Sequence, residues 1–233
     1  MTDTLFPPAQ VQTLALAGHS ARFPVNRIFC VGRNYEAHAA EMGGTVDREA
    51  PWYFLKSATH AVCLSGATIP YPPGTANYHH EMELVVAIGA PVFRASEDQA
   101  QAAILAYGCG LDMTRRDRQQ DGKDNRRPWD LGKDFEDSAV LGPLTPAAGL
   151  PSLKGRRIWL TVNGQVRQDA TLDELVWSPV EVVRHLSQYY HLKPGDVIMT
   201  GTPAGVGPVV AGDVIEGGID GLAGVRLTIG AAE

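Results

Sequence analysis

The run GRRIWLTVNGQVRQDA at residues 155–170 constrains the fold most, because it predicts a β-hairpin. Asn163 and Gly164 suit a two-residue turn of type I′, in which both central residues have positive φ. Residues typical of strands flank the turn on both sides. A hairpin pairs its strands antiparallel, so this part of the chain does not fit the strand–helix alternation of a doubly wound parallel sheet.

Further apolar runs predict strands that do not alternate regularly with helices. These runs lie at 11–18, 26–32, 84–89, 196–201, 213–218 and 224–230. Short helices are expected over 34–44, from Ser96 to about residue 106, and from Ser178 to Tyr190; the last two open with capping boxes. The pattern favours an α+β fold that is mostly β, with a mixed, mainly antiparallel sheet structure and short helices packed outside.

Composition limits the class of protein. The 233 residues are 44% hydrophobic and 20% charged, which is typical of a soluble globular protein, and the net charge of −6 argues against a nucleic-acid partner. No apolar run is long enough to span a membrane, and the N-terminus lacks the basic region of a signal peptide. Cys30, Cys63 and Cys109 have no zinc or disulfide spacing, so we expect reduced cysteines in a cytoplasmic protein.

Two glutamates begin the apolar run YHHEMELVVAIG at residues 78–89. Side chains alternate along a strand, so Glu81 and Glu83 point to the same face. Either the strand end is open to solvent and both acids are hydrated, or the carboxylates hold a divalent cation. Asp112, at the end of another apolar run, would complete a three-carboxylate site, although it could instead be a helix N-cap. Such a donor set suits Mg²⁺, Mn²⁺ or Ca²⁺.

His38 and Glu41 lie three residues apart in the expected helix over 34–44. A carboxylate that accepts the imidazole N–H makes the other ring nitrogen a better base, and such a base can activate water. The alternative is an ordinary surface pair.

Seven stretches, taken together and in order, resemble the fumarylacetoacetate hydrolase family. They are CVGRNYEAHAAEMG, FLKS, HHEMELVVAIG, YGCGLDMTRRDRQ, PWDLGKDFEDSA, VNGQVRQ and PGDVIMTGTPAGVGP, within residues 27–229. Lacking a separate N-terminal domain, the chain is similar to the compact acylpyruvase and fumarylpyruvate hydrolase branch. The resemblance implies a mixed β-sandwich roll, with residues 1–26 as an N-terminal extension that includes a strand and 27–233 as one catalytic domain. It also implies a homodimer and a Mg²⁺ or Mn²⁺ cofactor.

The resemblance also implies roles for residues. Glu81, Glu83 and Asp112 would bind the metal, while His38 and Glu41 would activate water from a helix that acts as a lid. The residues expected against the substrate are Lys133, Arg116, Gln119 and Thr202.

The implied reaction is metal-dependent hydrolysis of a carbon–carbon bond in an acylpyruvate. Lys133 and Gln119 would stabilise the oxyanion. We expect fumarylpyruvate as the substrate, giving fumarate and pyruvate. Binding its second carboxylate in a closed site needs a cation, and the chain offers arginines for this role. Arg33 is the preferred candidate, and Arg126 and Arg127 are also available.

Two alternatives stay open. An oxaloacetate or other β-keto acid decarboxylase of the same family would use the same metal site but needs no attacking water, so the His38–Glu41 pair favours hydrolysis. A catalytically inactive, metal-dependent binding protein is the other alternative, and the presence of Lys133 with this pair argues against it.

Overall fold

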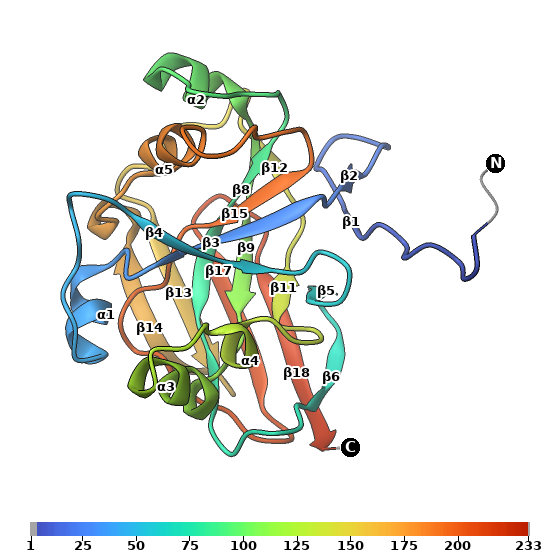
Figure 1. The fold of residues 1–233 in the computed structure, drawn as a ribbon, viewed down its shortest axis with the longest axis vertical. Coiled ribbons are helices and arrows are strands. Elements are labelled where there is room, and N and C mark those ends of the chain that lie inside the picture. Colours follow the sequence, from blue (N-terminus) through green and yellow to red (C-terminus); the bar gives the residue numbers. More distant parts are fainter. Residues whose placement is uncertain (1–3, 233) are drawn as a thin grey trace.

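The computed structural model describes residues 4–232, in which strands predominate and short helices lie around the outside of the sheets (Figure 1). Most strand pairings are antiparallel, and three are parallel. The predicted fold class, a mostly β α+β fold of mixed sheets with peripheral helices, is therefore confirmed.

The largest sheet carries the two strands that matter most for the site. Its strands run in the order β4–β3–β15–β8–β9–β11–β5, and β12 pairs with β9. Their bounds are β3 (Arg27–Gly32), β4 (Trp52–Lys56), β5 (Val62–Leu64), β8 (Met82–Ile88), β9 (Ile104–Asp112), β11 (Ala139–Leu141), β12 (Thr145–Pro146) and β15 (Asp196–Met199). All residues of β8 are buried, and alternate side chains enter two different hydrophobic clusters on its two faces. Glu83 shares its face with Val85, so it points into the interior.

The second sheet contains the predicted hairpin. Its order is β14–β13–β17–β18–β6. The bounds are β6 (Thr68–Tyr71), β13 (Arg157–Val162), β14 (Gln165–Thr171), β17 (Val214–Ile219) and β18 (Val225–Ala232). Asn163 and Gly164 join β13 to β14 with φ values of 52° and 76°, as a type I′ turn requires. Both sheets contribute to one large core, in which Leu84 of β8 and Leu160 of β13 are buried together.

Two small sheets complete the strand arrangement. The first pairs β1 (Thr13–Leu14) with β2 (Phe23–Pro24), and the second has the order β10–β7–β16, with bounds β7 (Tyr78–His80), β10 (Thr114–Arg115) and β16 (Gly207–Pro208). The strand expected over 11–18 is thus only two residues long. Leu14 and Phe23 are buried in the cluster that contains Ile28 of β3. The division of the chain at residue 26 stays a prediction.

The helices are short, and two of them were not predicted. They are α1 (Glu36–Glu41), α2 (Glu97–Ala103), α3 (Arg116–Asp124), α4 (Asp130–Lys133) and α5 (Pro179–Leu186), with a 3₁₀ turn η1 (Leu172–Glu174). Both predicted capping boxes are present, at Ser96 and Ser178. The helix α2 ends before the predicted residue 106 because Ile104 adopts an extended conformation and begins β9. Similarly, α5 ends at Leu186, before Tyr190.

The cysteines lie in the interior of the protein. Cys30, Cys63 and Cys109 are buried and free, as predicted. Among residues 4–232, no helix combines the length and the apolar character needed to cross a bilayer.

Candidate active site

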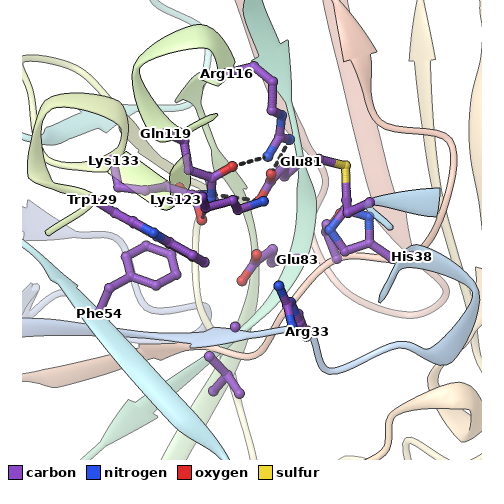
Figure 2. Close-up of a pocket in the computed structure, with 15 residues that line it drawn as sticks. Arg33, His38, Phe54, Glu81, Glu83, Arg116, Gln119, Lys123, Trp129 and Lys133 are labelled. Atoms are coloured by element: carbon purple, nitrogen blue, oxygen red, sulfur yellow. Dashed lines mark hydrogen bonds and ion pairs between the residues drawn. The ribbon is translucent and has the colours of Figure 1, made fainter. Parts of the chain in front are cut away.

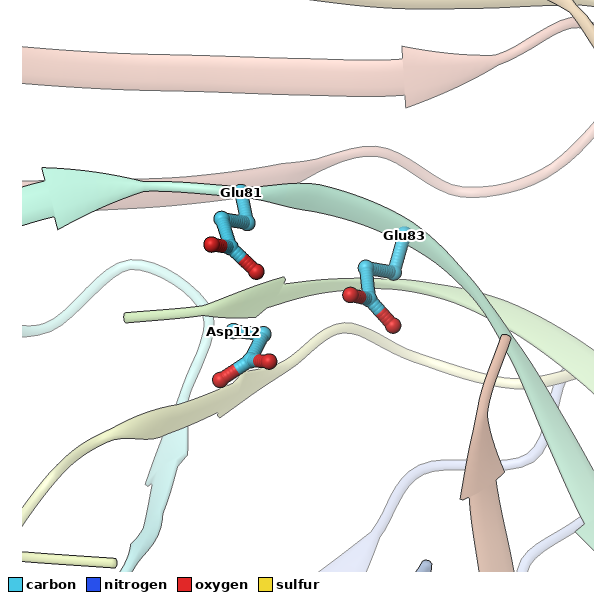
Figure 3. Close-up of side chains that lie close together, drawn as sticks. All are labelled: Glu81, Glu83 and Asp112. Carbon is cyan, nitrogen blue, oxygen red and sulfur yellow. The ribbon is translucent and has the colours of Figure 1, made fainter. Parts of the chain in front are cut away.

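Three carboxylates meet where β8 and β9 run side by side. Glu81 lies between β7 and β8, Glu83 belongs to β8, and Asp112 is the last residue of β9. The backbone N–H of Asp112 donates to the carbonyl oxygen of Glu81 at 2.9 Å, which places the two residues next to each other. One carboxylate oxygen from each of the three lies within 4.8 Å of the others (Figure 3). This is the grouping that the sequence predicted.

Burial decides between the alternatives for these acids. Glu81 is 4% exposed, Glu83 1% and Asp112 0%. The idea of hydrated acids at a solvent-exposed strand end is therefore wrong. Asp112 does not cap a helix either, because the next residues form β10 and α3 begins only at Arg116.

The two glutamates have opposite electrostatic environments. Burial by itself raises the pKa of Glu81, but the positive charges of Lys133 and Arg116 outweigh it and hold this pKa well below its usual range. Burial also raises the pKa of Glu83, and the negative charges of Asp112 and Glu81 add to that effect, so this pKa lies well above its usual range. Negative charge at Glu83 is thus incompletely offset by the protein's own cations.

The cluster fits a hard divalent cation. Asp112 Oδ1 is buried and accepts no hydrogen bond from the part of the chain that the structure describes, although Lys56 Nζ lies 2.9 Å away as an ion pair. The negative charge at Glu83, next to two more carboxylates, leaves a place for a positive ligand. Three carboxylates without nitrogen or sulfur donors match Mg²⁺ or Mn²⁺.

Lys133 is fully engaged by protein groups. Its Nζ donates to Glu81 Oε2 at 2.8 Å, to Asp112 Oδ2 at 2.7 Å and to Thr114 Oγ1 at 2.8 Å. A lysine ammonium has three N–H donors, and all three are used. Lys133 therefore holds the carboxylates in place, and its predicted role toward an oxyanion would require it to give up one of these bonds.

Arg116 and Gln119 lie one turn apart on α3 and bind each other. The Arg116 guanidinium donates to Glu81 and, at 2.6 Å, to Gln119 Oε1. Within residues 4–232 the Gln119 amide N–H₂ has no hydrogen-bond partner, so it is available to a ligand in the pocket. Close packing fixes this position, because a Cβ on Gly132 of α4 would lie 2.6 Å from the Gln119 backbone nitrogen.

The predicted dyad is formed on α1. His38 Nδ1 lies 3.3 Å from Glu41 Oε2, and the Glu41 carboxylate also accepts the backbone N–H of Gly205. With the Nδ1 proton directed to Glu41, the Nε2 of His38 is the basic nitrogen. Burial lowers the pKa of His38, and the opposing charges of Glu81 and Glu41 do not cancel this effect. The imidazole is therefore neutral near pH 7 and able to accept a proton.

A buried amide, to which the sequence analysis gave no role, connects three parts of the site. Gln168 of β14 donates to Thr202 Oγ1 and to the Pro203 carbonyl oxygen, both at 2.8 Å, and accepts the backbone N–H of Met82 at 2.9 Å. Since Thr202 Oγ1 accepts this bond, its own O–H remains able to donate into the pocket. Gln168 thereby positions Thr202 against the strand that carries Glu83.

The predicted residues converge on one pocket, shown in Figure 2. Arg116, Gln119 and Lys123 lie on one side of the glutamates, and His38 and Arg33 on the other. The pocket is lined by Val31, Gly32, Arg33, His38, Met42, Phe54, Glu81, Glu83, Asp112, Arg116, Gln119, Lys123, Trp129, Lys133 and Thr202. Glu41 is not in this lining and reaches it through His38.

Two arginine candidates lie elsewhere, and one lysine was missed. Arg126 and Arg127 are exposed and do not line the pocket. Lys123, which the sequence analysis did not consider, does line it. A helical spacing could have revealed Lys123, because positions 116, 119 and 123 share one face of a helix.

A comparison with family models decides the wider relationship. Residues 27–230 match the model of the fumarylacetoacetate hydrolase C-terminal domain. The chain belongs to the fumarylacetoacetate hydrolase family. The resemblance found in the sequence is therefore confirmed.

Similar proteins carry different names, among them fumarylpyruvate hydrolase and oxaloacetate tautomerase. A fumarylpyruvate hydrolase from Ralstonia sp is 53% identical over 82% of this chain and all of its own length. An oxaloacetate tautomerase from Escherichia coli (strain K12) is 39% identical over 85% of this chain and 90% of its own length. Among solved structures, a fumarylpyruvate hydrolase from Pseudomonas aeruginosa in complex with Mn²⁺ and pyruvate is 43% identical, with a TM-score of 0.92, covering 98% of this chain and 100% of that chain.

Proposed function

We propose that this protein hydrolyses acylpyruvates, with fumarylpyruvate as the substrate and fumarate and pyruvate as the products. The observation that carries the proposal is the placement of His38, oriented by the Glu41 carboxylate, in the same pocket as Glu81, Glu83 and Asp112. The similarity to fumarylpyruvate hydrolases over most of the chain supports it.

We further propose that Glu81, Glu83 and Asp112 hold Mg²⁺ or Mn²⁺. A cation bound there would act as a Lewis acid toward the pyruvyl oxygens and the charge that develops on them. The support is the buried all-oxygen donor set and the Mn²⁺ bound by the related P. aeruginosa enzyme.

The protein's own groups can carry the remaining steps. His38 Nε2 accepts a proton as water attacks the acyl carbonyl carbon, and Glu41 keeps the imidazole in the required tautomer. The Gln119 amide donates to the oxygen that becomes negative, and Thr202 can donate beside it. The bond between the acyl carbon and the methylene then breaks, its electron pair leaves with the pyruvyl part as an enolate, and the proton taken up by His38 is returned to that carbon to give pyruvate.

The far carboxylate of fumarylpyruvate needs a cation at the other end of the pocket. Arg33, just before α1, is half-buried and lines the pocket. Its guanidinium is therefore our candidate for binding that end of the substrate.

A second candidate function is keto–enol conversion of oxaloacetate, which several relatives at 36–39% identity are named for. The same pocket would then move a proton without cleaving a carbon–carbon bond. Decarboxylation of a β-keto acid, and ligand binding without turnover, are the remaining alternatives.

Assays on purified protein with Mg²⁺ or Mn²⁺ separate these functions. Loss of the enol absorbance is followed for fumarylpyruvate and acetylpyruvate, and products are identified by chromatography. For oxaloacetate, enol formation and pyruvate release are measured separately. Hydrolysis of fumarylpyruvate faster than any oxaloacetate reaction supports the proposal. Faster oxaloacetate tautomerisation or pyruvate release would replace it, and no turnover of any of the three would favour a binding protein.

The assembly and location also remain proposals. We propose a cytoplasmic homodimer, which light scattering coupled to size-exclusion chromatography would test by the mass in solution. A mass of one chain would contradict the dimer.

A further inference from the structure

Five cations surround the carboxylate cluster, and three of them are already committed to protein partners. Lys133 uses all its donors, and Arg116 is bound to Glu81 and Gln119. Lys56 donates to the Met113 and Lys133 carbonyl oxygens and pairs with Asp112. Neither lysine has an N–H left for a ligand unless it loses an existing contact, and the Arg116 guanidinium is already paired with the Glu81 carboxylate.

Lys123 and Arg33 differ from the other three. Both line the pocket, and neither makes a side-chain hydrogen bond or an ion pair with a carboxylate anywhere in residues 4–232. Lys123 is half-buried, and its Nζ lies 5.3 Å from the centre of the Trp129 ring. Arg33 lies similarly over Trp52, with its Cζ 5.7 Å from the ring centre, and the two tryptophan rings contact edge to face at 4.6 Å. Two unpaired cations thus stand over one aromatic pair.

The electrostatic surroundings of Lys123 favour an anionic ligand. Burial lowers the pKa of Lys123 to about 8, the positive charges of Arg116 and Arg33 contribute, and the negative charge of Glu81 opposes this shift without cancelling it. A half-buried ammonium near two guanidinium groups is destabilised until an anion joins it. The lining has more cationic than anionic side chains even before a divalent cation is counted, so a substrate with two carboxylates suits it better than one with a single carboxylate.

The pocket lining beside Lys123 is partly aromatic. Phe54 and Trp129 lie together on one side of the pocket, with ring centres 6.0 Å apart (Figure 2). Flat apolar rings suit a planar, conjugated chain, which would lie against them while its charged end continues past them.

We propose that Lys123 binds the carboxylate at the far end of the acyl arm and so determines the preference for dicarboxylic over monocarboxylic acylpyruvates. This inference rests on the proposed function and adds a specificity-determining residue to it. Arg33 approaches the same anion from the α1 side. Arg126 and Arg127 are excluded from this role because they are exposed and do not line the pocket.

The kinetic test compares two substrates that differ at the acyl end. In Lys123→Gln, the ratio of kcat/KM for fumarylpyruvate to kcat/KM for acetylpyruvate should fall about tenfold or more, as expected for a lost charge-assisted hydrogen bond. Lys123→Arg should recover a large part of the ratio. Lys193→Gln, at an exposed lysine outside the pocket, should leave the ratio at the wild-type value. An unchanged ratio in Lys123→Gln would overturn the proposal.

A binding test does not depend on turnover. With Mn²⁺ present, calorimetry compares 2-oxoheptanedioate with 2-oxoheptanoate, which share the 2-oxo acid end and differ only in the far carboxylate. Wild-type protein should bind the diacid more tightly, and Lys123→Gln should lose most of this advantage. If the wild-type protein hydrolyses no acylpyruvate, and Lys123→Gln still loses the tighter binding of the diacid, the proposed reaction fails while the Lys123 site stands. Equal binding of both acids by wild-type protein, or an equal advantage in both variants, refutes the site.

Discussion

Glu83 accepts a hydrogen bond from the backbone N–H of Gly201 at 2.8 Å. This contact ties the central strand β8 to the loop after β15, where Thr202 lies. The donor to the Glu83 carboxylate is thus a backbone N–H, whereas the Glu81 carboxylate is bound by the side chains of Lys133 and Arg116. The acid with fewer partners is thus held by a backbone group, and its position depends on the fold rather than on another side chain.

The metal site can be tested with isosteric changes. Glu83→Gln and Asp112→Asn should each reduce the affinity for Mn²⁺ by more than tenfold, because each removes an anionic oxygen from the cluster. Isothermal titration calorimetry measures the effect. Glu97→Gln, at an exposed acid on α2, is the matched control and should retain wild-type affinity. Wild-type affinity in both site variants would refute the metal assignment.

Substitutions in the His38–Glu41 dyad should lower the rate of turnover without lowering the affinity for the metal. His38→Ala should reduce kcat for acylpyruvate hydrolysis by about 10²–10⁴-fold, which is the usual contribution of a general base. Glu41→Gln should cost less, because that carboxylate only orients the imidazole and accepts the Gly205 N–H. Mn²⁺ affinity should be retained in both, and His19→Ala, at an exposed histidine, controls for the substitution itself. Hydrolysis by His38→Ala at the wild-type rate would rule out His38 as the base.

The pH profile should reflect the lowered pKa of His38. A base with a lowered pKa stays neutral, and therefore active, at pH values where an ordinary imidazole of pKa about 6.5 would be protonated. We expect the midpoint of the acidic limb of kcat/KM to lie below that of an ordinary imidazole. The residual activity of His38→Ala should lack this acidic limb. A midpoint above 6.5 in the wild-type profile would contradict the buried, neutral imidazole.

The hydrogen bonds of the buried Gln168 amide should contribute to the stability of the fold around the site. Gln168→Ala leaves the buried Met82 N–H and the Pro203 carbonyl oxygen without their partner, so the free energy of unfolding should fall by about 1–3 kcal/mol. Denaturant unfolding measures this change, and Gln165→Ala, at an exposed position of the same strand, should have a much smaller effect. A loss no larger than that of Gln165→Ala would show that the amide network contributes little.

The segment around α1 should become protected when the site is filled. Asn34 anchors its start, since its side chain donates to the Thr200 and Trp177 carbonyl oxygens. Residues 36–44 have no comparable anchor beyond Glu41, so we expect their amides to exchange slowly only when oxalate and Mn²⁺ are both added. Hydrogen exchange with mass spectrometry measures this difference, and β8 provides an internal reference that should not change. Equal protection with and without ligand would argue against a lid.

Local patterns in the sequence were sufficient for the hairpin, the two capping boxes and the shared direction of Glu81 and Glu83. Each of these depends on residues a few positions apart, so the backbone geometry of one element settles it. The dyad is of the same kind, because His38 and Glu41 are neighbours on one short helix.

What only the tertiary structure decided is how distant segments meet. The register between β8 and β9 brings Asp112 beside Glu81, and Lys133 on a helix that was not predicted enters between them. The opposite pKa shifts of Glu81 and Glu83 follow from this packing, since burial is common to both and only Glu81 receives two cationic partners. Lys123 and Arg33 differ from the other nearby cations because the fold gives carboxylate or carbonyl partners to Lys133, Arg116 and Lys56. Electrostatic interactions of this kind depend on the distances between charges in space, and these distances cannot be read from the spacing of residues along the chain.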